Sequence, residues 1–142
     1  MDGPIVVGTD GSETASVAVT ESIQLAKAFE QTLHIVCAYQ RQSVALGDVP
    51  AEFADHVRAD SKVQAILDDA SSRARRAGVK VEAHSVAGDA ADALLDLAEG
   101  LGAHLIVVGN KGIGSVRRYV LGNIPSKVVH HAPCSTFVVH TT

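Results

Sequence analysis

The stretch LIVVGNKGIGSVRRYVLGNIPS occupies residues 105–126 and carries the strongest structural signal in the chain. Its first four residues are apolar and predict a buried strand, and Gly109 and Gly112 punctuate the loop that follows. A short helix is expected over residues 126–131, with Asn123 as its N-cap. A strand, a glycine-containing loop and a helix start can hold a phosphate with backbone amides. The stretch therefore indicates an α/β fold with an anion site.

The distribution of charge supports an anion site at this loop. The chain has a formal net charge of −4, yet its 16 acidic residues all lie at or before Glu99. The basic residues beyond that point are Lys111, Arg117, Arg118 and Lys127. Because a basic segment without acidic neighbours attracts anions, we expect at least one of the first three to contact phosphate. The acidic overall balance argues against duplex nucleic acid as a partner.

Outside this stretch, apolar runs alternate with helical patterns along the whole chain. The predicted strands cover residues 5–7, 33–39, 79–86, 104–108 and 135–140. Helices are predicted between them, one capped by Ser12, one over residues 51–77 and one opening at Asp89. Val- and Ile-rich strands, each followed by a helix, are typical of a parallel sheet covered on both faces. The sequence thus predicts one α/β domain over residues 1–142, with an open five-stranded parallel sheet.

Two of these elements carry more detailed expectations. The helix after Ser12 has an inward stripe at steps of three and four residues, made by Ala15, Ala18, Val19, Ser22, Ala26 and Phe29. The run at 79–86 alternates apolar and polar residues, which favours an edge strand with one wetter face.

The spacing of the glycines resembles that of a known family. Gly109, Gly112 and Gly122 stand in the pattern G-x2-G-x9-G, which is similar to the loop of nucleotide-binding members of the universal stress protein family. The segment VGTDGS at 7–12 resembles the family's opening turn, and PCSTFVVH at 133–140 resembles its last strand, so the resemblance covers the whole chain. Neither the pattern GxxxxGK[ST] nor a complete dinucleotide fingerprint is present.

The resemblance implies a sheet in the order 3-2-1-4-5 and an ATP site at the switch point between the first and fourth strands. It implies that the glycines of the motif and the residues after Gly122 hold phosphates, while strand two lines the adenine pocket through its backbone and small side chains. The predicted nucleotide-binding residues are Gly8, Thr9, Asp10, Val36, Cys37, Ala38, Gly109, Asn110, Lys111, Gly112, Arg117, Arg118, Gly122, Asn123, Ile124 and Pro125.

Asn123 departs from the family pattern, in which ATP-binding members have Ser or Thr after the third glycine. An Asn amide can donate to a phosphate oxygen as a hydroxyl does, but it is larger. We therefore expect the site to be retained in an altered form. The departure favours AMP or cyclic AMP as alternatives to ATP, and it supports a second hypothesis, a nucleotide-free dimeric interaction module like the family's non-ATP-binding branch.

The chemistry of the glycine loop favours holding a nucleotide over hydrolysing it. Residues 100–142 contain no carboxylate, whereas phosphoryl transfer needs charge that positions Mg²⁺ and the nucleophile. Asp10 is expected to shape an Asx turn or to contact ribose, adenine or a Mg²⁺-bound water, and these roles are compatible. No catalytic residue is assigned, and slow ATP hydrolysis is kept as an alternative.

The remaining features suggest a cytoplasmic homodimer without a metal site. The apolar runs are strand-sized and no apolar leader precedes the first strand, so neither a membrane partner nor a secretory signal is expected. Cys37 and Cys134 lack CxxC spacing and are expected to be reduced thiols, and the histidines show no ligand spacing to cysteines or acids. The resemblance implies a stress-response role and dimerisation, for which the short apolar strand at 137–140 offers an edge.

Overall fold

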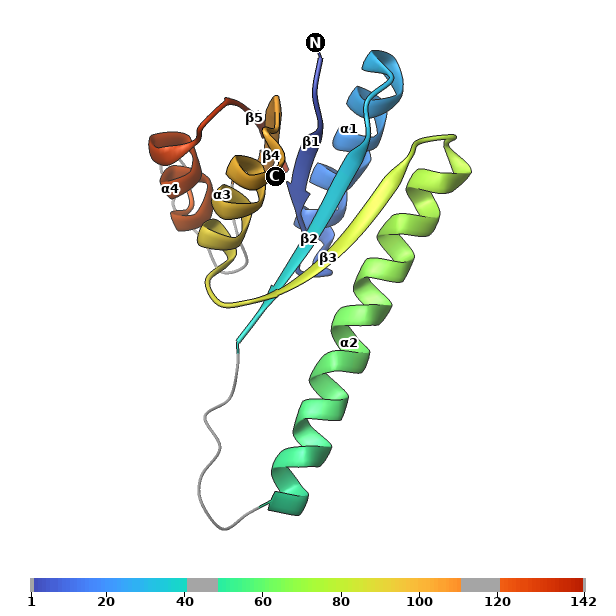
Figure 1. Ribbon diagram of the computed structural model, residues 1–142, viewed down its shortest axis with the longest axis vertical. Helices are drawn as coiled ribbons and strands as arrows, with labels where there is room; N and C mark the ends of the chain where they lie inside the picture. Colours follow the sequence, from blue (N-terminus) through green and yellow to red (C-terminus); the bar gives the residue numbers. More distant parts are fainter. Residues whose placement is uncertain (1, 41–48, 111–120, 142) are drawn as a thin grey trace.

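The predicted strands form one parallel sheet in the order β3-β2-β1-β4-β5. The computed structural model describes residues 2–40, 49–110 and 121–141, and Figure 1 shows the sheet between two layers of helices. The strands are Ile5–Gly8 (β1), Leu33–Tyr39 (β2), Val81–Ala87 (β3), Leu105–Gly109 (β4) and Ser135–Val139 (β5). The α/β class, the parallel sheet and the strand order implied by the resemblance are confirmed.

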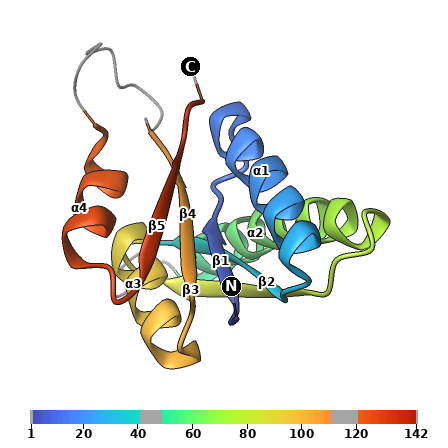
Figure 2. The ribbon, with the colours of Figure 1, turned by 90° about the horizontal axis from the view of Figure 1, so that it is seen from above.

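The helices of the described residues are Glu13–Phe29 (α1), Val49–Arg76 (α2), Ala90–Leu101 (α3) and Asn123–His131 (α4). The first two cover one face of the sheet, and α3 and α4 cover the other, as Figure 2 shows. Within the described ranges, no helix combines the length and hydropathy that a membrane crossing needs. Because every strand runs in the same direction, all the helices that follow strands begin on the same side of the molecule, beyond the carboxyl ends of the strands.

The core follows from the alternation of side chains along each strand. On β1, Ile5 and Val7 pack against the α1–α2 layer and Val6 packs against the α3–α4 layer, and all three are fully buried. Ile106 on β4 is likewise fully buried, in the α3–α4 layer. Two apolar layers thus hold β1 and β4 together in the middle of the sheet.

Four of the six residues of the stripe predicted for α1 are buried, Ala15 is partly buried and Phe29 is exposed. Ser12 is the N-cap, and its Oγ accepts a hydrogen bond from the amide of Ala15 at 3.2 Å. Phe29 was expected to face inward, yet 42% of it is exposed. This prediction was wrong because α1 ends at Phe29 and the chain turns away at Glu30, whose φ is 55°.

The helix α4 begins about one turn earlier than expected. Gly122 is its N-cap and Asn123 is its first residue, so the prediction of Asn123 as the cap was wrong. The amide of Gly122 donates to the carbonyl of Asn110 at 3.0 Å. This hydrogen bond places the helix start beside the end of β4, because it joins the two ends of the intervening loop.

The two edge strands of the sheet are β3 and β5. On β3, Glu82, Ala83 and Ser85 are exposed, which agrees with the predicted edge position. On β5, 41% of Phe137 and 39% of Val138 are exposed. The sheet therefore ends on one side in a strand of mixed polar and apolar residues and on the other in a strand that exposes two large apolar side chains.

Candidate functional site

A cavity lies at the carboxyl ends of β1 and β4, where the strand order changes direction. It measures about 120 Å³ and opens to solvent. In doubly wound sheets ligands bind at this switch point, in the crevice outside the strand ends. The cavity is lined by Gly8, Thr9, Asp10, Ser12, Thr14, Ala15, Ala18, Val36, Ala38, Ala90, Leu94, Val108, Gly109, Ile124 and Pro125.

The turn after β1 supplies the polar side of the cavity. Oγ1 of Thr9 accepts from the amide of Gly11 at 3.1 Å, and Oδ1 of Asp10 accepts from the amide of Ser12 at 2.9 Å. The second contact is the expected Asx turn. The amide of Thr9 donates to the carbonyl of Val36 at 2.9 Å and ties the turn to β2. The Thr9 hydroxyl can still donate and the Asp10 carboxylate can still accept, so both remain able to contact a ligand.

Gly11 holds this turn in a conformation that only glycine adopts without strain. Its φ is +83°, and a Cβ at this position would lie 2.8 Å from Cγ1 of Ile66 on α2. The polar turn is therefore packed tightly against the neighbouring helix.

Small apolar side chains form the floor of the cavity. Val36 and Ala38 project from β2 toward the α3–α4 layer, and Leu94 of α3 packs in the same cluster. A Cβ at Gly8 would approach Cδ1 of Leu94 to 3.2 Å, so the end of β1 lies in close contact with α3. An aliphatic floor beside a polar turn suits a flat heteroaromatic ring that carries polar substituents.

The first turn of α4 forms the remaining wall, through Ile124 and Pro125. In any helix the first amides lack intrahelical partners, which leaves the amides of Asn123 and Ile124 for another acceptor. Pro125 has no N–H to add. The positive end of the helix dipole and the absence of an acidic residue in this turn favour an anionic group here.

Asn110 connects the end of β4 to the chain terminus. Its Oδ1 accepts hydrogen bonds from the amide of Thr141 at 2.8 Å and from the Thr141 hydroxyl at 2.9 Å. Its backbone amide donates to the carbonyl of Val139 at 2.9 Å. Asn110 thus holds Val139 through its backbone amide and Thr141 through its side-chain oxygen, beside the end of β4.

The structure brings half of the predicted nucleotide-binding residues to the cavity, namely Gly8, Thr9, Asp10, Val36, Ala38, Gly109, Ile124 and Pro125. Cys37 packs instead in the core of the α1–α2 layer, and burial raises the pKa of its thiol. Gly122 and Asn123 lie at the start of α4. Lys111, Gly112, Arg117 and Arg118 lie outside the described residues.

Sequence reasoning missed the contributions of the helix starts. The lining residues that it did not assign to nucleotide binding are Ser12, Thr14, Ala15, Ala18, Ala90, Leu94 and Val108. All but Val108 lie at the N-cap or in the first two turns of α1 and α3. The contributions of the helix starts could have been anticipated, because every helix that follows a strand of a parallel sheet begins near the carboxyl ends of the strands.

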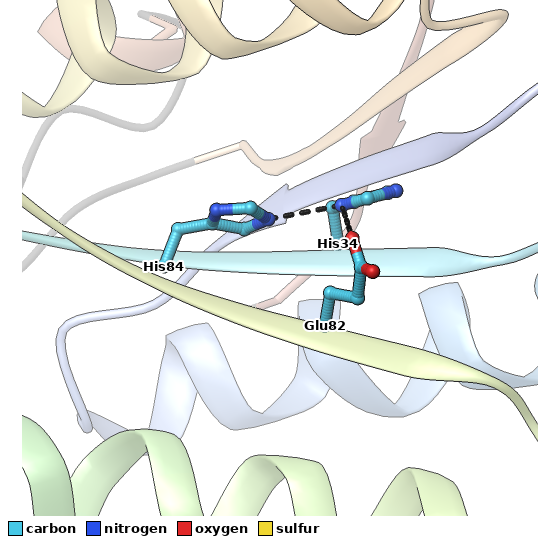
Figure 3. A group of neighbouring side chains, drawn as sticks. All are labelled: His34, Glu82 and His84. Atoms are coloured by element: carbon cyan, nitrogen blue, oxygen red, sulfur yellow. Dashed lines mark hydrogen bonds and ion pairs between the residues drawn. The ribbon is translucent and has the colours of Figure 1, made fainter.

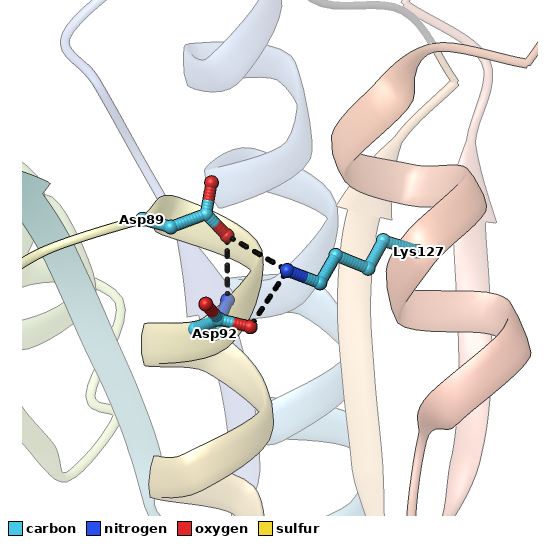
Figure 4. A network of polar contacts seen from close by, with 3 residues as sticks. All are labelled: Asp89, Asp92 and Lys127. Carbon is cyan, nitrogen blue, oxygen red and sulfur yellow. Dashed lines mark hydrogen bonds and ion pairs between the residues drawn. The ribbon is translucent and has the colours of Figure 1, made fainter.

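A charged contact joins the two helices of the α3–α4 layer (Figure 4). Oδ2 of Asp89, the N-cap of α3, accepts from the amide of Asp92 at 3.0 Å. Nζ of Lys127 on α4 lies 3.4 Å from this oxygen and 2.8 Å from Oδ1 of Asp92. The hydrogen bond from the Asp92 amide, with a smaller effect of the Lys127 charge, holds the pKa of Asp89 below its usual value. The contact links α3 and α4, which contribute Leu94 and Pro125 to the lining of the cavity.

Replacing Asp89 with asparagine is expected to retain the cap of α3 and to reduce the acid sensitivity of the chain. Since the folded-state pKa of Asp89 is below its unfolded value of about 3.9, its contribution is present above that pH and is lost as pH falls through the folded pKa. Urea unfolding at pH 7 and pH 3 should show a smaller acid loss for D89N than for wild type. Asp89→Ala, which removes the cap, should cost about 1 kcal/mol at pH 7. Equal acid losses in wild type and D89N would contradict this assignment.

Comparisons with known proteins found a family model, a relative and solved structures that match nearly the whole chain. A model of the universal stress protein family matches residues 1–140. A universal stress protein of Mycobacterium tuberculosis is 37% identical over 141 residues, covering 97% of this chain and 96% of its own. A solved universal stress protein in complex with cAMP has a TM-score of 0.77 at 33% identity, over 99% of this chain and 98% of that chain. A family protein of Arabidopsis thaliana with AMP bound has a TM-score of 0.70 at 17% identity, over 99% and 93% of the two chains, a likeness of fold alone.

Proposed function

Because the chain belongs to the universal stress protein family, we propose that its cavity binds an adenine nucleotide and that the chain acts as a regulatory or nucleotide-holding protein of the stress response. The observation that carries the proposal is the cavity itself, which joins the polar turn after β1 to the first turn of α4 across the switch point of the sheet. The two cysteines, Cys37 and Cys134, are unpaired, which supports a reducing compartment such as the cytoplasm.

Each part of a nucleotide has a matching wall in this proposal. The adenine ring packs on the aliphatic floor at Val36 and Ala38, where no charged group has to be desolvated. The ribose hydroxyls can form hydrogen bonds with the turn after β1, because the Thr9 hydroxyl can donate and the Asp10 carboxylate can accept. A phosphate meets the amides at the start of α4.

ATP is the ligand that the glycine spacing implies, and a monophosphate is a second candidate with support of its own. The first turn of α4 offers the amides of Asn123 and Ile124, whereas Pro125 contributes none. Two amides suit one phosphate group. A related structure, 33% identical to this chain, holds cAMP. The second candidate is therefore cyclic AMP or AMP, bound with its single phosphate at α4.

Release and identification of the bound ligand test the proposal directly. Purified chain is denatured and the supernatant is analysed by mass spectrometry, and the refolded or ligand-free chain is titrated calorimetrically with ATP, ADP, AMP and cyclic AMP, with and without Mg²⁺. We expect saturable binding of at least one of these nucleotides. Tighter binding of ATP than of the monophosphates supports the first candidate, and the reverse order supports the second. No released nucleotide and no heat with any ligand would contradict the proposal and favour a nucleotide-free interaction module.

We further propose that the chain forms a homodimer through β5. This strand is an edge of the sheet, so its outer backbone groups are available to a second strand. Phe137 and Val138 expose large apolar side chains on it, which a partner copy would cover. Antiparallel pairing of two β5 strands combines both features, since backbone hydrogen bonds and apolar burial then act at the same contact.

Replacing Phe137 with aspartate is expected to convert the dimer into monomers in sedimentation velocity. The substitution places a charge on each copy at the pairing strand, where apolar contact is lost and like charges repel. Phe29→Asp is the matched control, because Phe29 is exposed to the same extent, 42% against 41%, but lies at the end of α1. A dimer that persists in F137D, or that is lost equally in F29D, would remove β5 as the interface.

A further inference from the structure

Three side chains with metal-binding atoms converge on β2 and β3, outside the cavity described above (Figure 3). His34 on β2 is the register partner of Glu82 on β3. His84 follows Glu82 by two residues on β3, opposite Val36, so it lies on the same face of the sheet. Nδ1 of His34 lies 2.9 Å from Nε2 of His84 and 3.3 Å from Oε2 of Glu82. All three ligand atoms lie within 4.8 Å of one another.

Nδ1 of His34 is the atom that both neighbouring ligand atoms approach, Nε2 of His84 at 2.9 Å and Oε2 of Glu82 at 3.3 Å. A ring nitrogen carries at most one hydrogen, so this single atom cannot donate a full hydrogen bond to both neighbours. A metal ion placed between the three atoms can accept a lone pair from each of them.

We propose that His34, Glu82 and His84 form a binding site for a divalent transition-metal ion of the zinc type, with His34 coordinating through Nδ1 and His84 through Nε2. Two imidazoles and one carboxylate are a ligand set that zinc accepts. None of the three residues lines the cavity at the switch point. The site is therefore separate from the proposed nucleotide site, although it occupies the same face of the sheet.

Two of the three separations between ligand atoms are close to those around a tetrahedral ion, and the third pair, Glu82 and His84, lies within 4.8 Å. Zinc–nitrogen bonds of about 2.0–2.1 Å at tetrahedral angles place neighbouring ligand atoms about 3.3 Å apart. The His34–Glu82 separation already has this value, 3.3 Å, while the imidazole nitrogens at 2.9 Å have to move apart by about 0.4 Å. The partly exposed His84 can make this movement, and its position on an edge strand leaves room for it.

The exposure of the three residues gives the ion a path and an open position. His34 is buried, with 4% of its surface exposed, whereas the side chain of Glu82 is 63% exposed. An ion can enter from the solvent beside Glu82 and lose part of its hydration shell against the buried imidazole. Three protein ligands leave a fourth position for water, as in zinc sites that are not purely structural.

Zinc titration of the chain without an affinity tag tests the proposal. Competition with a chromophoric zinc chelator is expected to show one site per chain, weakened at least about tenfold in both H84A and E82Q, since even partners outside the coordination sphere are worth about 10- to 100-fold. H104A is the matched control, because His104 is exposed and is not part of the cluster. E82Q alters an exposed side chain and keeps its shape, so it covers the case in which H84A fails to fold.

The identity of the coordinating atoms provides a second readout. Nitrogen-15 spectra of the histidine rings should show zinc-dependent shifts at Nδ1 of His34 and Nε2 of His84, and no comparable shift at His104. Equal zinc affinity in wild type, H84A and E82Q would overturn the proposal, as would the absence of a stoichiometric site in wild type. In either case the cluster is a hydrogen-bonded network only. Because the site shares no residue with the cavity, nucleotide binding is expected to survive in all these variants.

Discussion

Replacing Ala38 with phenylalanine should weaken adenine nucleotide binding by about 100-fold or more while leaving the fold intact. Ala38 lies on the floor of a cavity of about 120 Å³, and a phenyl group at this position fills most of that space. The ligand then has to displace the ring or bind outside the floor, which costs about 3 kcal/mol, equal to roughly 100-fold in affinity. Isothermal titration calorimetry with the nucleotide that wild type binds most tightly measures this loss.

Ala83→Phe provides the control for the change at Ala38. Ala83 is also a strand alanine, but it is exposed on β3 and does not line the cavity. We expect A83F to bind nucleotide with wild-type affinity, and both variants to unfold within a few degrees of wild type. If A38F binds as tightly as A83F, the adenine ring does not occupy the floor, and the proposed orientation of the nucleotide is incorrect.

Replacing Ile106 with alanine should lower the free energy of unfolding by about 3–4 kcal/mol. Ile106 is fully buried on β4, in the middle of the sheet, and contributes to the α3–α4 layer. Removing three carbon atoms there loses their transfer free energy and leaves a cavity that strands paired on both sides cannot close. Since a domain of this size is stable by about 5–15 kcal/mol in total, the variant should unfold at a clearly lower urea concentration.

Val17→Ala is the comparison for Ile106→Ala. Val17 lies on α1 and is 39% exposed, so its truncation should change the free energy of unfolding by no more than about 0.5 kcal/mol. Urea titrations followed by circular dichroism measure both variants under the same conditions. A loss in I106A as small as that in V17A would mean that the layer between the sheet and α3 relaxes around the missing atoms.

The strands, the helices and the strand order of this chain were predictable from its sequence. The apolar run at 105–108 became β4 with one added residue, and the helix cap at Ser12 was correct. Such features depend on neighbours three or four positions away, which the sequence displays directly. The strand order came from the resemblance, because the G-x2-G-x9-G spacing identifies a family whose sheet has one topology.

The cavity was predictable only in part. The turn at Thr9 and Asp10 and the residues after Gly122 were expected at the site from the family resemblance, and Thr9, Asp10, Ile124 and Pro125 line the cavity. Leu94 does not belong to any motif and reaches the cavity because α3 packs over the ends of β1 and β2. The cap of α4 was misassigned to Asn123, since the hydrogen bond from Gly122 to Asn110 joins residues twelve positions apart in sequence.

The cluster at His34 was decided by tertiary structure alone. Sequence alternation places His34 on a face of its strand, but it does not tell which residue of β3 lies opposite. His34 was therefore treated as a histidine with no cysteine or acid at ligand spacing, whereas the structure brings Glu82 to it as its register partner across the strands. A slip of one residue would pair His34 with Val81 or Ala83 and turn Glu82 to the other face. The register is determined by the packing of α2 against both strands, a set of long-range contacts. Periodicity and motif spacing thus determine the elements and the family of this chain, whereas the meeting of side chains across strands depends on packing between segments far apart in sequence.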